Sequence, residues 1–371
     1  MRIAITKSTL RIPPTYFATA HAELLSERFD FEAFTLVADV RDPSVRQMIR
    51  QAVPFPQLGF RPRELIMPAF MPLMTRAIRN YHPDVIHQHF ATWSLPAVRA
   101  SRGAGTPLLT TLHGADVMVF SKPAATAQQR WHHLNVRSAN QTSSRLLAVS
   151  GYLADRAVSA GMDASKIVVH YQGIDTDYFV PQARDDRDRE APVLLFVGAL
   201  NEQKGARDLL KASLELIKTQ EHQVRLVGQG PLESELRALA DNSPHVTFLS
   251  PLGRAGVRRE MQLAHCLVAP SQQVAGTREA AGLVLLEAQA CATPVVAYDS
   301  GGISEMVSDE TGQLISEGHV NELTSALSEL LTMPVGDKDS MNRRARDFVV
   351  EHRSLQRSST ELADHYTDVA R

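Results

Sequence analysis

The clearest indication of the fold is Ser271–Ser300, SQQVAGTREAAGLVLLEAQACATPVVAYDS, which is followed by Gly301 and Gly302. Its apolar runs and glycines predict the end of a strand, a loop, a helix that begins at Gly282, another strand and a glycine turn. Parallel strands joined by helices form an open α/β sheet, in which ligands bind to the loops at the carboxyl ends of the strands. We therefore expect this segment to contribute both to a doubly wound sheet and to a ligand site.

The start of the predicted helix has the features of a phosphate site. Backbone N–H groups around Gly282, Leu283 and Val284 form an anion cradle, and glycine lets a phosphate approach closely. A nucleotide diphosphate is the expected occupant. Two carboxylates, Glu279 in the loop and Glu287 in the helix, would repel it unless they accept hydrogen bonds from sugar hydroxyls. We expect Glu287 to hold a ribose and Glu279 to hold a group beyond the diphosphate.

A strand and helix alternation extends over the chain on both sides of one charged segment. Short β-branched runs alternate with helical patterns, and Pro181–Pro192 (PQARDDRDREAP) separates the two series. The length of 371 residues fits two domains at about 150 residues each. We expect Rossmann-like, doubly wound α/β domains at 1–187 and 188–352 that face each other across a crevice, and a C-terminal helix near 353–371 that packs back on the first domain.

The composition indicates a folded protein without covalent staples. The chain has 44% hydrophobic and 22% charged residues, enough apolar material to bury cores. Its two cysteines, Cys266 and Cys291, lie in apolar stretches, which excludes a disulfide framework. The N-terminus lacks the apolar stretch of a signal peptide, and no window has the ~18 apolar residues of a spanning helix. A cytoplasmic protein is expected.

The net charge of −2 hides two halves of opposite sign. Residues 1–180 hold 19 Lys and Arg against 13 Asp and Glu, whereas residues 181–371 hold 20 against 28. Neither a basic excess nor a recognition motif points to nucleic acid. Residues 41–79 carry seven arginines among phenylalanines and methionines, and the prolines at 54, 56, 62, 68 and 72 are expected to break any long helix. This segment fits an anionic acceptor or a peripheral contact with an anionic inner membrane face, or equally a core-facing helix with solvated arginines.

The spacing of Glu279 and Glu287 resembles the E-x7-E signature of retaining glycosyltransferase family 4, whose members have the GT-B fold and use nucleotide sugars. Other segments are similar to that family's motifs in the right order along the chain. They are LTTLHGADVM (109–118), HYQGIDTDYF (170–179), FVGALNEQKGARDLLKA (196–212) and LVGQGPLESEL (226–236).

The resemblance implies a role for each matching residue. Lys204 would neutralise the diphosphate, and His113 would contact the donor sugar from the N-terminal domain. Glu279 would hold that sugar together with the backbone of Ala281–Leu283. The family relies on the leaving phosphate to help deprotonate the acceptor, so stabilisation of the departing diphosphate should dominate. The implied catalytic residues are His113, Lys204 and Glu279; the further donor-binding residues are Gly198, Gly228, Ala281, Gly282, Leu283, Val284 and Glu287.

The implied reaction is transfer of a hexose with retention from a nucleoside diphosphate sugar, with UDP preferred to GDP. The acceptor would be a hydroxyl of a glycan, a lipid-linked molecule or a small molecule in polysaccharide or glycoconjugate biosynthesis. No metal and no cofactor are expected. A GT-B-fold phosphorylase, a nucleotide-sugar epimerase and a non-catalytic partner subunit that keeps the fold are the alternatives.

This chain departs from the family pattern at two places that bear on function. Ala199 stands where the family commonly has an arginine, so Arg254 or Arg278 is expected to supply the missing cation. The segment KSTLRIPPT (7–15) replaces the usual glycine-rich loop. Lys7 and Thr15 in it are therefore candidates for the acceptor side.

Several polar residues of the first half invite a metal or an acceptor role. His87 and His89 alternate on one strand face, but no nearby cysteine or acid completes a tetrahedral metal set, so we expect them to line the acceptor side. Asp116 is a further acceptor-side candidate, or a cap of the next helix. Asp175–Asp177 resembles the DxD motif of GT-A enzymes, yet it lies in the interdomain segment, and no metal site is predicted.

Overall fold

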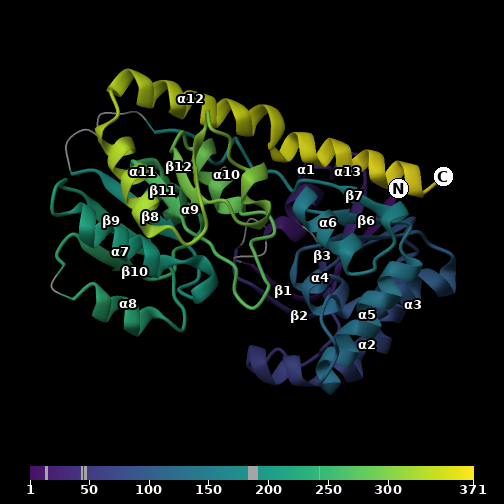
Figure 1. Ribbon diagram of the computed structural model, residues 1–371. Helices are drawn as coiled ribbons and strands as arrows, with labels where there is room; N and C mark the ends of the chain where they lie inside the picture. Colours follow the sequence, from purple (N-terminus) through teal and green to yellow (C-terminus); the bar gives the residue numbers. More distant parts are fainter. Residues whose placement is uncertain (13–15, 43–44, 46–47, 183–190, 242) are drawn as a thin grey trace. The chain divides into compact units, whose positions relative to one another are not determined.

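The structure is a computed structural model, and it describes residues 1–371 except 13–15, 43–44, 46–47, 183–190 and 242 (Figure 1). The chain forms two compact units. Met1–Gln172 and Leu355–Arg371 make up the first unit, and Gly173–Ser354 makes up the second. The C-terminal residues therefore fold with the N-terminal part of the chain.

The division between the units falls before Gly173, ahead of the predicted boundary at 187/188. The reason is local packing: the Gln262 side chain, for example, donates a hydrogen bond to Val180 O (2.7 Å) and so holds this segment on the second unit. Such bonds satisfy backbone carbonyls that an open linker would leave to water. Most of the predicted linker, Pro181–Pro192, lies outside the described residues.

The first unit is built on a seven-stranded sheet with the order β3-β2-β1-β4-β5-β6-β7, and all of its pairings are parallel. Its strands are β1 (Arg2–Ile12), β2 (Asp30–Val40), β3 (Met48–Gln51), β4 (Val85–His89), β5 (Leu108–Leu112), β6 (Arg145–Ala148) and β7 (Ile167–Val169). The strand order reverses between β1 and β4. Ligands of open sheets bind at such switch points, outside the carboxyl ends of the strands.

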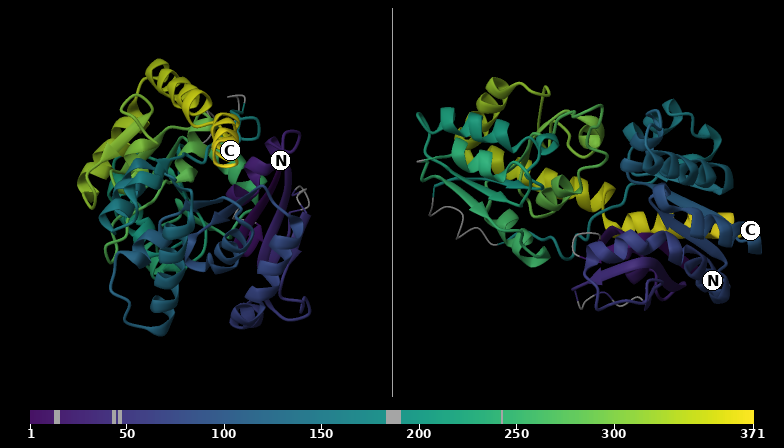
Figure 2. Two further views of the ribbon diagram at one scale, coloured as in Figure 1. Left: turned by 90° about the vertical axis from the view of Figure 1, so that its right-hand side faces the viewer. Right: turned by 90° about the horizontal axis from the view of Figure 1, so that it is seen from below.

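Helices cover both faces of this sheet. They are α1 (Ala20–Leu24), α2 (Phe60–Tyr81), α3 (Leu95–Ala104), α4 (Ala115–Phe120), α5 (Ala127–Thr142), α6 (Gly151–Ser159) and α13 (Leu355–Val369). Residues Ile86 and Leu108 share a core with α2 and α3, whereas their strand neighbours Val85 and Leu109 share one with Tyr366 of α13. Neighbouring residues of a strand point to opposite faces, so α13 closes the face opposite to α2. Figure 2 shows α13 in yellow beside the N-terminal strand.

The helix α2 contradicts the prediction that prolines break the segment 41–79. It runs unbroken for 22 residues with Pro68 and Pro72 inside it. Each proline removes one helical hydrogen bond. Both prolines are exposed, whereas another face of the same helix buries Met67, Met71 and Met74 in the core. This burial offsets the missing bonds.

The second unit is built on a six-stranded sheet with the order β10-β9-β8-β11-β12-β13, again parallel throughout. Its strands are β8 (Val193–Val197), β9 (Gln223–Val227), β10 (Val246–Leu249), β11 (Cys266–Ala269), β12 (Val295–Tyr298) and β13 (Gly312–Ile315). Its helices are α7 (Ala206–Leu216), α8 (Glu233–Leu239), α9 (Arg254–Leu263), α10 (Leu283–Ala290), α11 (Val320–Thr332) and α12 (Val335–His352). The switch point lies between β8 and β11.

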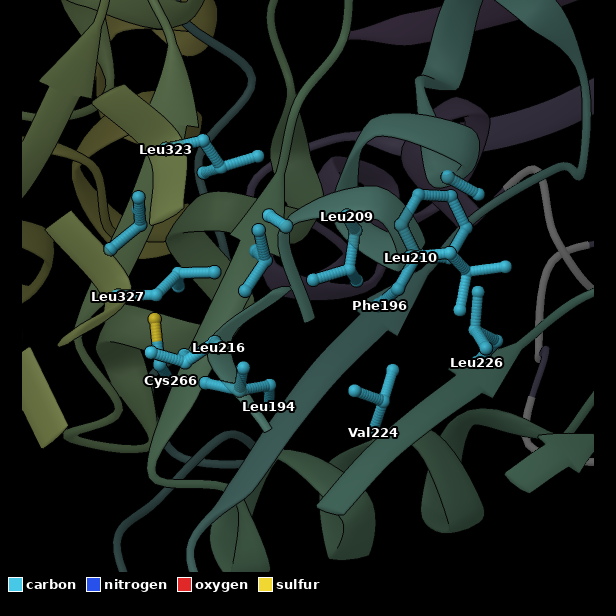
Figure 3. Packing of buried hydrophobic residues seen from close by; sticks show 14 of the residues in the cluster. Leu194, Phe196, Leu209, Leu210, Leu216, Val224, Leu226, Cys266, Leu323 and Leu327 are labelled. Atoms are coloured by element: carbon cyan, nitrogen blue, oxygen red, sulfur yellow. The ribbon is translucent and has the colours of Figure 1, made fainter. Parts of the chain in front are cut away.

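The core of the second unit is a leucine-rich layer between this sheet and the helices α7, α8 and α11 (Figure 3). Leu194 and Val224 of the sheet pack against Leu209 of α7 and Leu327 of α11. Cys266 belongs to the same core and carries a free thiol, as expected from its apolar neighbours. Two doubly wound parallel sheets confirm the predicted fold class. Across the part of the chain that the structure describes, no helix is long and apolar enough to cross a bilayer.

The stretch Ser271–Ser300 has the predicted order of elements. It leaves β11, crosses a loop and enters α10 after Gly282, whose φ of +72° makes it the N-cap. The chain then forms β12 and turns at Gly301, whose φ is +68°. The segment therefore joins two neighbouring strands of the sheet at its switch point side.

Candidate active site

Lys204 and Glu279 meet as an ion pair in the second unit, although 75 residues separate them in sequence. Lys204 ends the short 3₁₀ turn Glu202–Lys204, in which the Asn201 side chain accepts a hydrogen bond from Lys204 N (3.0 Å). The Lys204 Nζ donates a hydrogen bond to Glu279 Oε2. The two side chains are 29% and 17% exposed, so the pair is only partly shielded from water.

The pair borders a small pocket that is also lined by residues at the start of α10. Its lining residues are Phe196, Val197, Lys204, Leu267, Val268, Ala269, Ser271, Glu279, Gly282, Val284, Leu285 and Ile303. Ala281 is buried just before α10. The first N–H groups of a helix, here those of Leu283 and Val284, have no partner within the helix. A lysine ammonium and such N–H groups beside one pocket form a phosphate-binding arrangement.

Glycines hold the loops around this pocket in place. Gly302 N donates a hydrogen bond to Glu279 O (2.9 Å), and a Cβ on Gly301 would lie 2.2 Å from that same oxygen. The turn after β12 thus requires glycine, and it anchors the backbone of Glu279. Gly198 and Gly228, after β8 and β9, are equally close: a Cβ on Gly228 would lie 1.9 Å from Gly198 O.

Glu287 is a half-buried carboxylate on α10 that lacks donors. None of the described residues donates a hydrogen bond to its side chain. Burial raises the pKa of Glu287 to about 7, and the positive charge of Arg254 opposes that rise. A ligand that brings hydroxyl groups would stabilise such a carboxylate, and the role of Glu287 toward a ribose stays a prediction.

Both arginines proposed to replace the family cation already have carboxylate partners. Arg254, at the start of α9, donates a hydrogen bond to Asp175 Oδ2 (3.1 Å), and its guanidinium lies 4.0 Å from the centre of the Tyr178 ring. Arg278 Nε lies 3.2 Å from Glu317 Oε2. Of the two, Arg254 influences Glu287 electrostatically, and its role toward phosphate stays a prediction.

Asp175 is occupied by the fold of the interdomain segment. Its carboxylate accepts hydrogen bonds from Asp177 N (3.2 Å) and Tyr178 N (2.9 Å) in addition to the one from Arg254. These bonds make the DxD-like sequence a turn that is tied to α9. Among the residues that the structure describes, no group of three or more His, Cys, Asp or Glu side chains is arranged to hold a metal ion.

His113 lies in the first unit, directly after β5. Its Nε2 is 3.1 Å from His89 Nδ1, and its Nδ1 is 3.5 Å from the side-chain nitrogen of Gln172. The ring stacks on Phe90 with centres 4.2 Å apart. Burial lowers the pKa of His113 well below its usual value, so the imidazole is neutral near pH 7 and can both donate and accept a hydrogen bond.

Asp116 shapes the His113 loop and does not line an acceptor surface. Its side chain is fully buried, and its carboxylate accepts hydrogen bonds from the N–H groups of Ala91 (3.2 Å), His113 (3.1 Å), Gly114 (3.0 Å) and Val117 (3.1 Å). The predicted contact of Asp116 with an acceptor is therefore wrong, because every bond it makes is to the backbone around it.

His87 is likewise an interior residue, contrary to its predicted place on the acceptor side. It is 2% exposed, its Nδ1 is 2.6 Å from Tyr366 Oη on α13, and its Nε2 is 2.7 Å from Thr111 Oγ1. Both ring nitrogens are thus used within the unit. His89 is also buried, and its Nδ1 lies 3.1 Å from His113 Nε2.

Lys7 lies at the switch point of the first sheet, one residue past the last pairing of β1 with β4. Thr15 is outside the described residues. Phe90 was not among the predicted residues, yet it lies against both Lys7 and His113. Its φ of +63°, rare for an aromatic residue, cannot be inferred from its place after a strand.

Both halves of the chain match families of known proteins. Residues 15–178 match the family described as Glycosyltransferase Family 4, and residues 191–333 match Glycosyl transferases group 1. A D-inositol 3-phosphate glycosyltransferase of Gordonia bronchialis is 30% identical over 317 residues, which cover 78% of this chain and 68% of that protein. The Mycobacterium sp. (strain KMS) protein of the same name is 30% identical over 335 residues, 82% of this chain and 74% of that one.

Another relative is a GDP-mannose-dependent monoacylated alpha-(1-6)-phosphatidylinositol monomannoside mannosyltransferase of Corynebacterium glutamicum, 29% identical over 66% of each chain. Among solved structures, Anabaena Alr3699/HepE in complex with UDP and glucose superposes with a TM-score of 0.80 at 19% identity, covering 99% of this chain and 100% of that one. Sucrose-phosphate synthase from Thermosynechococcus elongatus gives 0.79 at 20%, covering 100% and 99%. The chain therefore belongs to glycosyltransferase family 4 and is a glycosyltransferase of the GT-B type.

Proposed function

We propose that this glycosyltransferase moves a hexosyl group, with retention, from a UDP-sugar to an acceptor hydroxyl in polysaccharide or glycoconjugate biosynthesis, without a metal or a cofactor. The observation that carries the proposal is the Lys204–Glu279 pair beside the start of α10. One cation, unpaired helix N–H groups and a carboxylate then lie around one pocket. A sugar diphosphate needs these three kinds of partner.

The pocket residues act by exchanging partners when the donor binds. Diphosphate oxygens replace Glu279 as the partner of Lys204, and the N–H groups of Leu283 and Val284 take further oxygens. The released Glu279 carboxylate accepts hydrogen bonds from the hydroxyls of the sugar, while Glu287 accepts those of the ribose. Lys204 then stabilises the charge that grows on the diphosphate as the glycosidic bond breaks. This electrostatic effect is the main contribution of the second unit.

The choice of UDP is supported by the solved structures of HepE with UDP and with UDP-glucose. The mannosyltransferase relative, which is GDP-mannose-dependent by name, supports the alternative base. The D-inositol 3-phosphate glycosyltransferase relatives support a small phosphorylated polyol as the acceptor. We commit to UDP and to an acceptor of this class.

Peripheral attachment to the inner face of the plasma membrane, and thus a cytoplasmic location, is part of the proposal. The helix α2 exposes Leu65 (83%) and Leu73 (52%) on the same side as Arg61 and Arg76, which are also exposed. Apolar side chains flanked by arginines fit an anionic lipid surface.

The test is a transfer assay with UDP-glucose and D-inositol 3-phosphate, in which NMR identifies the anomeric configuration of the product. We expect retention of the donor configuration, unchanged activity in EDTA and a loss of at least about a hundredfold in Lys204→Ala. A product of inverted configuration, or activity that EDTA abolishes, would contradict the proposal. Lys211→Ala, a change at another lysine of the same unit, is the control.

A further inference from the structure

Lys7 is a buried cation without a counter-charge. Its side chain is 9% exposed, and its Nζ donates one hydrogen bond to Thr9 O (2.6 Å) and lies 5.1 Å from the centre of the Phe90 ring. None of the described residues contributes a carboxylate within ion-pair distance of it. The ammonium group has three N–H donors, so the bond to Thr9 leaves donors for another partner.

The groups around Lys7 do not neutralise it. His89 and His113 are the titratable neighbours that interact with it, and burial lowers the pKa of both, so they carry no charge near pH 7. Asp116, beneath the His113 loop, has its carboxylate taken up by backbone N–H groups. Burial lowers the pKa of Lys7 to about 8. An ammonium group kept out of water without an anion is costly to the folded state.

Lys7 lies in the part of the sheet where ligands of open α/β sheets bind. It follows the last residue of β1 that pairs with β4, so it lies at the switch point, level with the carboxyl end of β4. Phe90 and His113, which lie next to it, are partly exposed. Phe90 adopts its φ of +63° directly after β4. Strained conformations of this kind persist where the surroundings hold them, often at ligand sites.

We propose that Lys7 is the centre of a phosphate-binding subsite in the first unit. The ammonium group donates its remaining hydrogen bonds to phosphate oxygens, and the dianion supplies the missing counter-charge. This subsite rests on the proposed function for its place in the reaction, since a phosphate there belongs either to a phosphorylated acceptor or to the diphosphate of the donor. The excess of Lys and Arg in the first unit attracts either anion.

The decisive variant is Lys7→Met, which keeps the length and apolar character of the side chain and removes the charge. Calorimetry on the full chain measures the affinity for inorganic phosphate, D-inositol 3-phosphate, unphosphorylated inositol and UDP. We expect affinity for inorganic phosphate to fall by about tenfold to a hundredfold, the usual effect of losing a charged hydrogen-bond partner. An equal loss for D-inositol 3-phosphate assigns the subsite to the acceptor, whereas an equal loss for UDP assigns it to the donor.

Two further measurements separate this role from a structural one. If the charge is uncompensated, Lys7→Met unfolds at the same or a higher temperature than the unmodified protein, whereas a residue that serves only to bind Thr9 O would destabilise it on removal. At pH of about 8.5, phosphate binding should take up protons from the buffer, because the dianion raises the pKa of Lys7. Lys7→Arg should retain most of the phosphate affinity, and Lys122→Met, at an exposed lysine of the same unit, should change nothing.

Phosphate and UDP affinities that Lys7→Met leaves unchanged would overturn the subsite. Phosphate binding without proton uptake would also overturn it, and this measurement needs no variant that must fold. Binding is measured without turnover, so the subsite can stand if the transfer assay fails, and the transfer assay can succeed if the subsite fails.

Discussion

Replacing Glu279 by glutamine should strengthen the binding of UDP while it weakens sugar transfer. In the unliganded protein the Glu279 carboxylate holds the Lys204 ammonium. UDP has a diphosphate but no sugar, so it must take Lys204 from Glu279 and receives nothing from that carboxylate in return. Glu279→Gln removes both the competing partner and its negative charge. A UDP-sugar, by contrast, would lose the carboxylate that accepts its hydroxyl hydrogen bonds.

The size of the effect follows from the exposure of the pair. With side chains 29% and 17% exposed, the ion pair is only partly shielded, and we assign it about 1 kcal/mol, near the upper end for pairs in contact with water. Relief of repulsion between Glu279 and the diphosphate adds a contribution of the same sign. A total of about 1 to 2 kcal/mol corresponds to UDP binding about fivefold to thirtyfold tighter. The loss of hydrogen bonds to the sugar should lower kcat/KM by about tenfold to a hundredfold.

Titration calorimetry with UDP measures the first effect, and initial rates with the UDP-sugar measure the second. Glu202→Gln is the matched control, because Glu202 lies in the same 3₁₀ turn as Lys204 but pairs with Arg207. It removes the same formal charge and should leave both quantities unchanged. If Glu279→Gln binds UDP more weakly than the unmodified protein, the partner exchange at Lys204 is refuted.

Further predictions concern other parts of the chain. Glu287→Gln should raise the free energy of unfolding at pH 8 by up to about 3 kcal/mol, because burial raises the pKa of Glu287 to about 7 and so opposes its ionised form. This gain in stability should shrink as the pH falls from 7 to 5, and urea unfolding that shows no gain at pH 8 would contradict the prediction. Tyr366→Phe should lower the free energy of unfolding by about 1 kcal/mol, because it removes the hydrogen bond to His87. In the unmodified protein, the free energy of unfolding should decrease as the pH falls below about 6.5, because burial lowers the pKa values of His87, His89 and His113 and their protonation therefore favours the unfolded chain. Urea unfolding curves that do not change between pH 7.5 and 5 would contradict this pH dependence. Leu65→Glu should leave the free energy of unfolding unchanged, because Leu65 is 83% exposed, but it should reduce cosedimentation with anionic vesicles. If the unmodified protein binds neutral vesicles as well as anionic ones, whatever the salt concentration, the proposed membrane contact is excluded.

The arrangement of Glu279, Gly282 and Glu287 could be predicted because these residues lie in one short segment. Glu279 lies on the loop, Gly282 caps the helix that follows, and Glu287 lies within that helix, so their spacing alone fixes their order along this segment. Glycine at a turn and an apolar run in a helix or strand are constrained by neighbouring residues. Such constraints are readable before any tertiary contact is known.

The residues that were misplaced depend on partners far away in the chain. His87 looks like a polar residue on a strand, but its partner Tyr366 is 279 residues distant. Asp116 looks like a free acid until the backbone of Ala91 folds onto it. The prolines of α2 are tolerated because Met67, Met71 and Met74 of the same helix reach the core. In each case a distant contact overrides the local preference.

The amino-acid order was sufficient for the two doubly wound sheets, the glycine turns and the place of Glu279 just before the helix that begins after Gly282, because each follows from patterns within a few residues. Folding was needed to show that Lys204 contacts Glu279 and that Lys7 is buried without a counter-charge. Burial and ion pairing depend on which surfaces meet in space. A lysine on a strand looks the same in the sequence whether its ammonium group faces water, pairs with a carboxylate or is buried without a counter-charge.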